Sequence, residues 1–376
     1  MKKIKFLDLH SQQQKIGVTL HKKLNKVLRS ANYIMGPEVG KLEKSLEKYT
    51  KAKYCISCAN GTDALILSLL SLKVERGDYV ICPSFTFPAT AEAILITGAT
   101  PIFVDVSKNT YNLCYKKLEH ILEKNKSKKN RIKAIIAVDL FGLPANYIKL
   151  KKIAKEYKVA VIADAAQSFG GSLNNIKVGA INDISCTSFF PAKPLGCYGD
   201  GGAIFVNKKT FKDKIVSLRS HGKSKDKYTI IDIGLNSRLD TLQAAILLEK
   251  MKIFEWELKQ KNIIAGEYLK ELEGYYRLPL IPKNSNSAWA QFTLQTKKRN
   301  QILLYLKEKN IPTAIYYPIP MHKQPAYKKY NTNYIELNNS LELSKSVFSI
   351  PIHPYLDNIQ REYIIKTLKD ASKYSQ

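Results

Sequence analysis

The sequence predicts an α/β fold in which a mostly parallel central sheet carries helices on both faces. The first observation is that short apolar runs alternate with amphipathic segments as far as about residue 206, a pattern typical of parallel strands joined by helices. The second is length: 376 residues exceed one domain of about 100–200 residues. A smaller second domain is therefore expected. Hydrophobic residues make up 45% of the chain, enough for a core of ordinary size.

The expected elements follow in chain order. The apolar runs that predict strands are 54–59, 79–82, 101–106, 134–138, 159–163, 185–189 and 203–206. Apolar residues at spacings of three and four predict helices at 37–53, 63–72, 89–97 and 148–157. A long helical pattern begins at about 239 and leads into the second domain. The proline-containing segments 311–320 and 348–354 predict extended or loop structure.

These patterns divide the chain into three parts. We expect an N-terminal arm at 1–15, a large domain at 16–250 and a small C-terminal α+β domain at 251–376. Ligands of parallel sheets bind beyond the carboxyl ends of the strands. The informative residues are therefore expected in the loops that follow the strands of the large domain.

The formal net charge of +28 raises the alternative of a non-enzymatic, basic nucleic-acid-binding protein. Its lysines are spread along the whole chain and no recognition module is found, so we expect no nucleic-acid partner. A positive field would still attract a phosphorylated substrate. The basic N-terminus lacks a following apolar region, and no run reaches the roughly 18–20 apolar residues of a membrane span. We therefore expect a cytoplasmic protein without a membrane partner.

Six cysteines include one Cys-x-x-Cys pair, formed by Cys55 and Cys58. A zinc site would need a second pair or well-spaced histidines, and neither follows in the sequence. The pair lies inside an apolar run, so both residues are expected to be buried in a strand. We expect neither a metal site nor a disulfide framework.

Two segments place polar residues at the ends of expected strands. In segment 60–65, Gly61 and Thr62 lie where a strand ends and a helix begins. Such a helix start offers free backbone N–H groups to a phosphate, although a simple capped helix has the same pattern. In segment 161–168, an apolar strand ends at Asp164, followed by Gln167. Asp164 could pair with a cationic ring nitrogen or cap the next helix.

Two further segments carry basic residues. Lys193 follows a strand and a proline turn, and the apolar, glycine-rich run around it predicts burial. A desolvated lysine has an accessible neutral form, which imine chemistry requires. In segment 234–240, Asn236 and Arg238 precede the long helix. Each of these two could be a ligand contact, a cap or a surface group.

Taken together and in this order, these segments resemble the DegT/StrS family of sugar aminotransferases. That family is a branch of the fold-type I enzymes that use pyridoxal 5′-phosphate (PLP). The match extends from FLDL (6–9) through GP (36–37) to HKQPAY (322–327), and its most specific part is SFFPAKPLGCYGDGGA (188–203). The resemblance implies a fold-type I PLP-dependent transferase.

The resemblance also implies a role for each matching position. Lys193 matches the catalytic lysine that carries PLP as a Schiff base, and Asp164 matches the carboxylate that keeps the pyridine nitrogen protonated. Gln167 matches the residue near the phenolic oxygen, and Phe87 matches the aromatic residue that stacks on the ring. The implied phosphate contacts are Gly61, Thr62, Ser188 and, from the partner subunit, Asn236. The last contact implies a homodimer with shared active sites.

The implied reaction moves an amino group from L-glutamate to a keto sugar nucleotide. Segments 188–200 and 316–322 resemble most the branch that aminates C3 of UDP-2-acetamido-2-deoxy-3-oxo-glucuronate for surface polysaccharide such as O-antigen lipopolysaccharide. The candidate substrate contacts are then Arg238, Tyr317 and His322. The guanidinium group of Arg238 suits bidentate binding of a carboxylate. The alternatives are C4 enzymes of UDP-4-keto-6-deoxy sugars and C3 enzymes of TDP-3-keto-6-deoxy sugars. Dehydratases of the same fold have histidine in place of Lys193.

Overall fold

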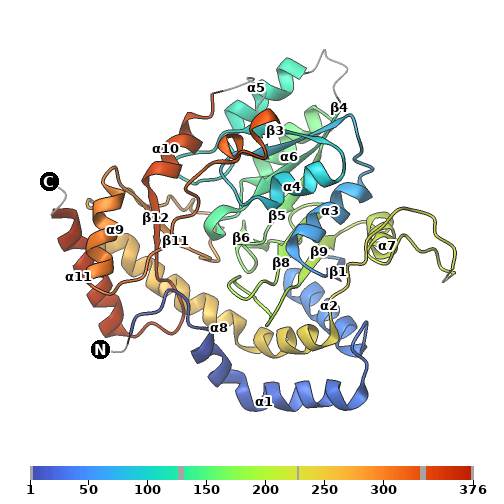
Figure 1. Cartoon of the computed structure of the whole chain (residues 1–376), viewed down its shortest axis with the longest axis horizontal. Coiled ribbons are helices and arrows are strands. Elements are labelled where there is room, and N and C mark those ends of the chain that lie inside the picture. Colours follow the sequence, from blue (N-terminus) through green and yellow to red (C-terminus); the bar gives the residue numbers. More distant parts are fainter. Residues whose placement is uncertain (1–2, 126–130, 227, 331–335, 374–376) are drawn as a thin grey trace.

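A seven-stranded sheet forms the centre of the protein (Figure 1). The computed structural model describes residues 3–125, 131–226, 228–330 and 336–373. In spatial order the strands are β1 (Tyr54–Cys58), β9 (Gly202–Val206), β8 (Ile184–Ser188), β5 (Ala160–Asp164), β4 (Arg131–Val138), β2 (Asp78–Pro83) and β3 (Thr100–Val104). Strand β9 runs antiparallel to both of its neighbours, and the other pairs are parallel. The expectation of a mostly parallel sheet is confirmed.

Both faces of the sheet are covered because successive side chains of a strand point to opposite sides. In β2, Val80 and Cys82 belong to the core cluster under one set of helices, while Ile81 belongs to another cluster. The first face carries α3 (Gly61–Ser71), α4 (Ala89–Ile96) and α7 (Lys209–Leu218). The opposite face carries α5 (Tyr115–Asn125), α6 (Tyr147–Glu156), α2 (Pro37–Thr50) and part of α8 (Thr241–Glu271).

The C-terminal part of the chain has a core of its own, at the left of Figure 1. It is built on the antiparallel pair β11 (Phe292–Gln295) and β12 (Val347–Ile350). The surrounding helices are α9 (Arg299–Glu308), α11 (Asn358–Lys373) and the end of α8. Helix α10 (Asn338–Ser346) instead contributes Leu343 to the core of the central sheet. Ile4 joins this core from the N-terminal segment. The expected divisions at 15 and 250 fall inside α1 (Leu9–Ser30) and α8, two helices that pack on each other.

The local structure of three segments agrees with the expectations. Helix α3 is capped by Asn60, whose side chain accepts a hydrogen bond from the Asp63 backbone N–H at 2.8 Å, and Thr62 lies in the first turn next to this cap. Segment 348–354 begins in the extended strand β12, which pairs with β11, and continues as a loop. The Cys55–Cys58 pair lies buried in β1 as expected, and both thiols are free. The remaining short elements are β6 (Ser172–Leu173), β7 (Ile176–Lys177), β10 (Ser285–Asn286) and the 3₁₀ turns Leu140–Gly142, Met321–Lys323 and Lys328–Tyr330.

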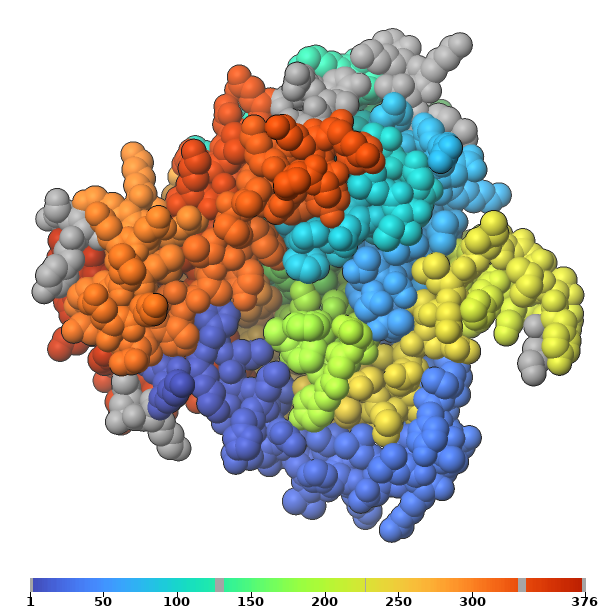
Figure 2. Space-filling model, viewed as in Figure 1, coloured from blue at the N-terminus to red at the C-terminus, as the bar shows by residue number. Residues whose placement is uncertain are grey.

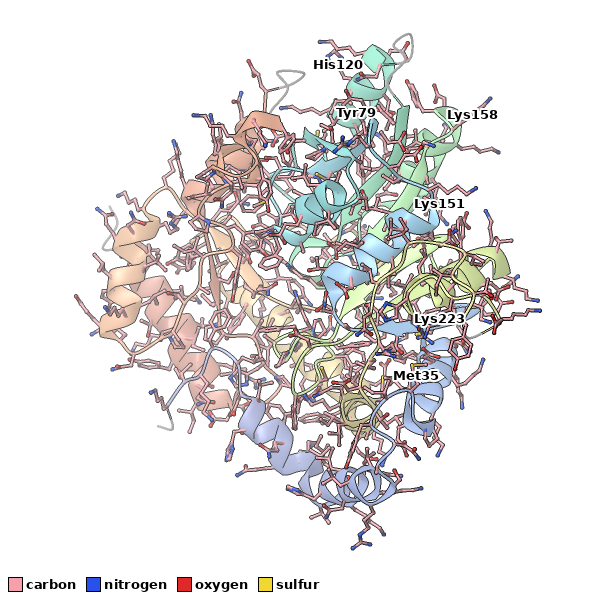
Figure 3. The ribbon with its side chains drawn as sticks, turned by 45° about the vertical axis from the view of Figure 1, so that its right-hand side comes forward. Met35, Tyr79, His120, Lys151, Lys158 and Lys223 are labelled. Carbon is pink, nitrogen blue, oxygen red and sulfur yellow. The ribbon has the colours of Figure 1, made fainter. Side chains whose placement is uncertain are left out.

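The positive charge is distributed around the molecule. Figure 3 shows Lys151 on α6, Lys158 just after this helix and Lys223 on another segment, all on the same side of the molecule in this view. A further basic group lies on α1, far from these in the fold. In the part of the chain that the structure describes, no helix is long and apolar enough to cross a membrane.

Lys250 is an unusual buried cation in the middle of α8. Its side chain is 1% exposed, and within the described residues its Nζ has no hydrogen-bond partner. Nζ lies 4.3 Å from the ring centroid of Tyr198. Burial lowers the pKa of Lys250 to about 8, because the charged form loses its hydration.

Replacing Lys250 with Met is therefore expected to stabilise the protein at pH 7 by about 1–3 kcal/mol. The folded-state pKa lies below the unfolded value of about 10.4, so the wild-type protein should gain stability as pH rises from about 8 to about 10.5. The Lys250→Met variant should lack this gain. Denaturant unfolding across this pH range measures both effects, with Lys259→Met at an exposed position of the same helix as the control. A variant less stable than wild type at pH 7 would contradict the prediction.

Candidate active site

Three predicted site segments meet at one edge of the central sheet. Asp164 is the last residue of β5, Ser188 is the last residue of β8, and Gly61 follows β1 at the start of α3. These three strands run in the same direction, because each of β1 and β8 is antiparallel to β9 and β5 is parallel to β8. Their carboxyl ends therefore share the edge at which such sheets bind ligands.

Asp164 lies buried at the floor of this site. Its Oδ1 accepts a hydrogen bond from the Ala166 backbone N–H at 3.2 Å, and its Oδ2 accepts one from Thr90 Oγ1 at 3.4 Å. No helix begins after it, since residues 166–170 form turns, so the alternative of a helix cap is wrong. Burial raises the pKa of Asp164, although the Ala166 N–H and the charge of Lys193 act against the rise. The carboxylate would thus gain from a cationic partner.

Lys193 lies in the loop that follows β8. It is near enough to Asp164 for the charge of each group to affect the pKa of the other. Its backbone N–H donates to the Phe190 carbonyl at 2.8 Å, which closes the proline turn. The side chain is partly buried, and this desolvation lowers the pKa of its amine despite the opposing charge of Asp164. The neutral, nucleophilic form of Lys193 is therefore easier to reach than that of a surface lysine.

The start of α3, which could bind a phosphate, lies against the end of β8. A Cβ added to Gly61 would be 2.7 Å from the Cβ of Ser188, so only glycine allows the start of α3 to approach the end of β8. Ser188 Oγ accepts a hydrogen bond from the Phe190 N–H at 3.2 Å and can still donate its own proton. Thr62 follows Gly61 in the first turn of α3, where free N–H groups attract an anion.

The aromatic residues Phe87 and Tyr317 lie close together near Gln167. The Gln167 Nε2 donates to Tyr317 OH at 3.1 Å, and its Oε1 accepts the Phe141 N–H at 2.7 Å. The rings of Phe87 and Tyr317 lie 6.2 Å apart. Phe87 is 53% exposed, although it is a large apolar residue, and a flat ligand could cover its ring. Burial raises the pKa of Tyr317, which keeps its hydroxyl protonated.

His322 is buried next to Ser84, which follows β2. Its Nδ1 is 2.5 Å from Ser84 Oγ, next to the carboxyl end of β2, and the Met321 N–H donates to the Ser84 carbonyl. Burial, together with the charge of Lys323, lowers the pKa of His322 to about 4. The imidazole is therefore uncharged at neutral pH, and any contact that it makes to a ligand would be a hydrogen bond.

Asn236 and Arg238 lie on a segment that runs beside the start of α3. Ser237 between them is buried, and its Oγ accepts a hydrogen bond from the Ala59 N–H at 3.2 Å. Asn236 is exposed and Arg238 is partly buried. Within the described residues, neither side chain forms a hydrogen bond or an ion pair with the rest of the chain. Both side chains are thus available to a ligand or to a second subunit.

The sequence analysis missed Thr90, Ser84 and Asp139. Thr90 and Ser84 carry no local signal, because their partners Asp164 and His322 lie 74 and 238 residues away. Asp139 does carry a local signal: it directly follows the apolar strand β4, just as Asp164 ends the apolar strand β5.

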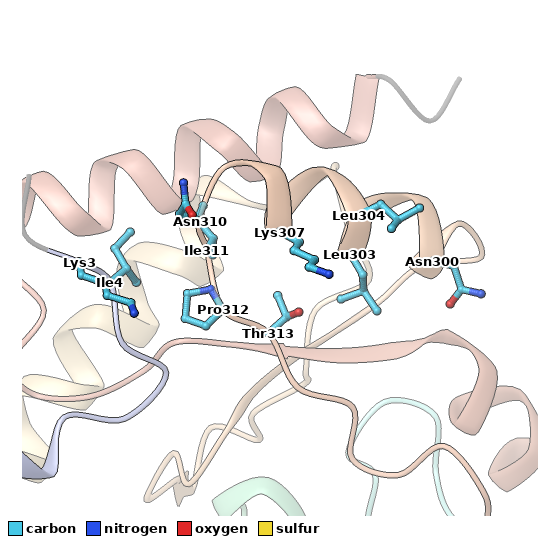
Figure 4. A pocket seen from close by; sticks show the side chains of 10 residues that line it. All are labelled: Lys3, Ile4, Asn300, Leu303, Leu304, Lys307, Asn310, Ile311, Pro312 and Thr313. Carbon is cyan, nitrogen blue, oxygen red and sulfur yellow. The ribbon is translucent and has the colours of Figure 1, made fainter.

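Outside this site, the structure has a groove of about 640 Å³ between α9 and the N-terminal segment (Figure 4). Its floor includes Ile4, Leu303 and Ile311, and none of the predicted site residues lines it. Among the residues described, no group of three or more His, Cys, Asp or Glu side chains could hold a metal ion.

Comparison with known proteins defines the class as aminotransferase. Residues 14–369 match the model of the DegT/DnrJ/EryC1/StrS aminotransferase family, and the chain belongs to this family. It is 43% identical over 366 residues to the UDP-2-acetamido-2-deoxy-3-oxo-D-glucuronate aminotransferase of Pseudomonas aeruginosa, covering 97% of this chain and 99% of that relative. The family predicted from the sequence is confirmed.

Solved structures agree with this assignment. A DegT DnrJ EryC1 StrS aminotransferase from Brucella abortus matches with a TM-score of 0.96 and 42% identity, over 98% of this chain and 99% of the other. The Bacillus subtilis protein NtdA with bound cofactor PMP matches with a TM-score of 0.89 and 28% identity, over 99% and 86%. The predicted fold class of PLP-dependent aminotransferases is confirmed.

Proposed function

We propose that this chain uses PLP to transfer an amino group from L-glutamate to a keto sugar nucleotide, and that the acceptor carbon is C3 of UDP-2-acetamido-2-deoxy-3-oxo-glucuronate. The observation that carries the proposal is the position of Lys193 near buried Asp164 at one edge of the sheet, where the charges of the two groups act on each other. Support for the acceptor comes from the relative that carries this activity in its name and shares 43% identity over nearly its whole length.

The residues at the site fit PLP. Asp164 is a buried carboxylate that forms no salt bridge within the described residues, Lys193 is a desolvated amine, and the start of α3 could bind an anion. When bound, the cofactor supplies an aldehyde for covalent attachment and a ring that accepts electrons from the breaking C–H bond. Asn60 accepts the backbone N–H groups of Asp63 and Ala64, so the N–H groups of Gly61 and Thr62 at the start of α3 are the ones that could bind the phosphate.

Each residue then has a physical task. Lys193 holds the cofactor, and its amine moves a proton to and from the α-carbon of the donor. Asp164 holds the proton on the ring nitrogen, because a buried carboxylate favours a cation beside it. Phe87 covers one face of the ring and excludes water there, and Gln167 orients the ring through its phenolic oxygen. In this assignment Thr62 and Ser188 bind the phosphate.

The acceptor would be held by residues beyond the cofactor. Arg238 offers a bidentate fork for the C6 carboxylate of a uronic acid, and Tyr317 offers a protonated hydroxyl. Uncharged His322 contributes hydrogen bonding and no charge. The positive net charge of +28 would attract the diphosphate of the nucleotide sugar. A TDP-linked 3-keto sugar and a UDP-linked 4-keto sugar are the competing acceptors.

A spectroscopic assay tests the proposed function. The purified protein reconstituted with PLP should change its absorption when L-glutamate is added, and the spectrum should recover on addition of the correct keto sugar nucleotide. The panel consists of the UDP-linked 3-oxo-uronate, a UDP-4-keto-6-deoxy sugar and a TDP-3-keto-6-deoxy sugar. Recovery with one of the latter two alone would reject the uronate, and no response to glutamate would reject the donor.

The proposal includes a homodimer with shared active sites, a cytoplasmic location, a role in surface-polysaccharide synthesis, and the three-part domain division given above. A dimer is supported by apolar side chains that lie exposed near Asn236. Residues 223–226 and 228–233 stand out from the body of the molecule (yellow in Figure 2), and Ile230, Ile231 and Ile233 among them are exposed, the last to 93%. Residues 33–35, which are also exposed, lie beside Asp240 through a bridge with Ile34.

Asn236→Ala is expected to weaken PLP binding by about tenfold without abolishing it. One lost hydrogen bond to a charged group costs about 1.5–3 kcal/mol at most, and the N–H groups of α3 continue to bind the phosphate. Equilibrium dialysis of PLP measures the change, with Asn207→Ala, outside the proposed site, as the control. A wild-type protein that remains fully active as a monomer would contradict the shared-site proposal.

Arg238→Ala is expected to lower kcat/KM for the 3-oxo-uronate by about 30-fold or more. Loss of the guanidinium leaves a buried carboxylate unpaired, which costs about 2–5 kcal/mol. The half-reaction with glutamate should survive, because the uronate takes no part in it. Stopped-flow absorbance measures both half-reactions, with Arg277→Ala, which is outside the proposed site, as the control. Collapse of the glutamate half-reaction would instead assign Arg238 to the donor carboxylate.

A further inference from the structure

A second buried carboxylate lies directly beside Asp164. Asp139 follows β4, and Val138 before it pairs with Asp164 in the register of the sheet. The Asp139 backbone N–H donates to the Asp164 carbonyl at 3.0 Å, and the Asp139 side chain is 0% exposed. The two carboxyl groups interact, since the charge of Asp164 helps to raise the pKa of Asp139.

Three donors converge on the Asp139 carboxylate. Its Oδ1 accepts hydrogen bonds from the Ala145 N–H at 2.8 Å and from Tyr147 OH at 2.6 Å, and its Oδ2 accepts one from Ser168 Oγ at 2.5 Å. An ionised carboxylate has only acceptors, so it matches this set of donors. An asparagine at this position would turn two N–H donors toward them.

The bond to Ser168 connects Asp139 to the residues proposed to touch the cofactor. Ser168 follows Gln167 in the turn that begins at Asp164, and the Ser168 N–H closes this turn on the Ala165 carbonyl. Gln167 is held from the same side, because its Oε1 accepts the N–H of Phe141, two residues after Asp139. The loop that starts with Asp139 therefore fixes the turn from 164 to 168.

We propose that Asp139 is a positioning residue that acts through Asp164 and Gln167: it fixes the turn that presents both, and its negative charge strengthens proton binding at the ring nitrogen of PLP. This inference rests on the proposed function. Asp139 lies outside the segments 60–65, 161–168, 188–203 and 234–240 that indicated the site.

The surroundings of Asp139 set the pH range in which its charge acts. Burial, with Asp164 adding to it, raises the pKa of Asp139 to about 7, although the three hydrogen-bond donors oppose the rise. The titratable groups that face it are Asp164 on β5, Tyr147 on α6 and Tyr115 on α5. Lys193 reaches it only through Asp164. Its charge is therefore complete above about pH 8 and lost below about pH 6.

The test is a pH titration of bound PLP in the holoenzymes of wild type and Asp139→Asn. Absorption of the bound cofactor, and the ¹⁵N shift of ring-labelled PLP, report the loss of cofactor protons without turnover. Removing a nearby negative charge should lower the apparent pKa of the ring nitrogen by about 0.5–1 unit. The affinity for PLP should fall several-fold, because the turn from 164 to 168 loses its support.

Asp105→Asn is the matched control. Asp105 is equally buried, follows β3, and accepts hydrogen bonds from the Ser340 N–H and hydroxyl at 2.8 and 2.6 Å. It should lose stability as Asp139→Asn does, but should keep the wild-type titration. An unchanged or raised cofactor pKa in Asp139→Asn, or an equal fall in both variants, would overturn the inference.

A second variant serves if Asp139→Asn does not fold. Tyr147→Phe removes one donor and leaves the carboxyl group in place, so the pKa of Asp139 should rise and its charge at pH 7 should fall. The apparent pKa of the ring nitrogen of bound PLP should then fall, as expected for Asp139→Asn. An unchanged apparent pKa would overturn the inference. Failure of the proposed function itself is distinguishable, because the wild-type protein would then take up no PLP.

Discussion

Replacing Lys193 with Ala is expected to abolish transamination, with a loss of at least about 10⁴-fold in kcat. Lys193 is the lysine whose charge acts on Asp164, so we expect no other residue to replace it in covalent attachment of PLP or in proton transfer at the α-carbon. The fold should persist, because the Lys193 side chain makes no hydrogen bond or ion pair within the described residues. Single-turnover absorbance with glutamate measures the loss, and circular dichroism checks the fold.

Two companion variants separate the roles of Lys193. Lys193→Arg keeps a positive charge near Asp164 but cannot deprotonate, so it should be as inactive as the Ala variant. Lys155→Ala removes an exposed lysine of α6 and should retain full activity. Wild-type turnover in Lys193→Ala would reject the assignment, and partial activity in Lys193→Arg would show that charge and not nucleophilicity is needed.

Asp164→Asn is expected to lower kcat for the glutamate half-reaction by at least about a hundredfold. The amide is isosteric and can keep one of the two hydrogen bonds from Ala166 and Thr90, but it has no charge to hold the proton on the ring nitrogen. Asp164→Ala should be at least as impaired. Rapid-scan absorbance and the ¹⁵N shift of ring-labelled PLP measure rate and protonation together.

The stability of the apo forms gives an independent check on Asp164. Burial raises the folded-state pKa of this carboxyl group above its unfolded value, so its ionised form destabilises the apo protein at neutral pH. Asp164→Asn should therefore unfold at the same temperature as wild type or higher, although it is impaired in catalysis. If the variant is nearly as active as wild type but much less stable, Asp164 is a structural residue.

Local sequence patterns predicted the strands of the large sheet and several of its helices, and they indicated two residues for the centre of the proposed site. Apolar runs bounded by turn residues predicted the seven strands of the large sheet, because a strand buried on both faces needs apolar side chains throughout. Asp164 could be placed because it ends such a strand. Lys193 could be placed because glycines and apolar residues surround it. Both signals are local, and the resemblance to the family supplied their chemical roles.

Tertiary structure alone decided which residues support that centre. Gln167 meets Tyr317 across 150 residues of chain, and Ser84 meets His322 across 238. The sheet register sets Asp139 beside Asp164 and gives it three donors. Burial then lowers the pKa of His322 and raises that of Asp139, because desolvation depends on everything packed around a group. The sequence by itself determined where the reactive groups lie along the chain, whereas their partners and charge states arise only from packing between distant segments.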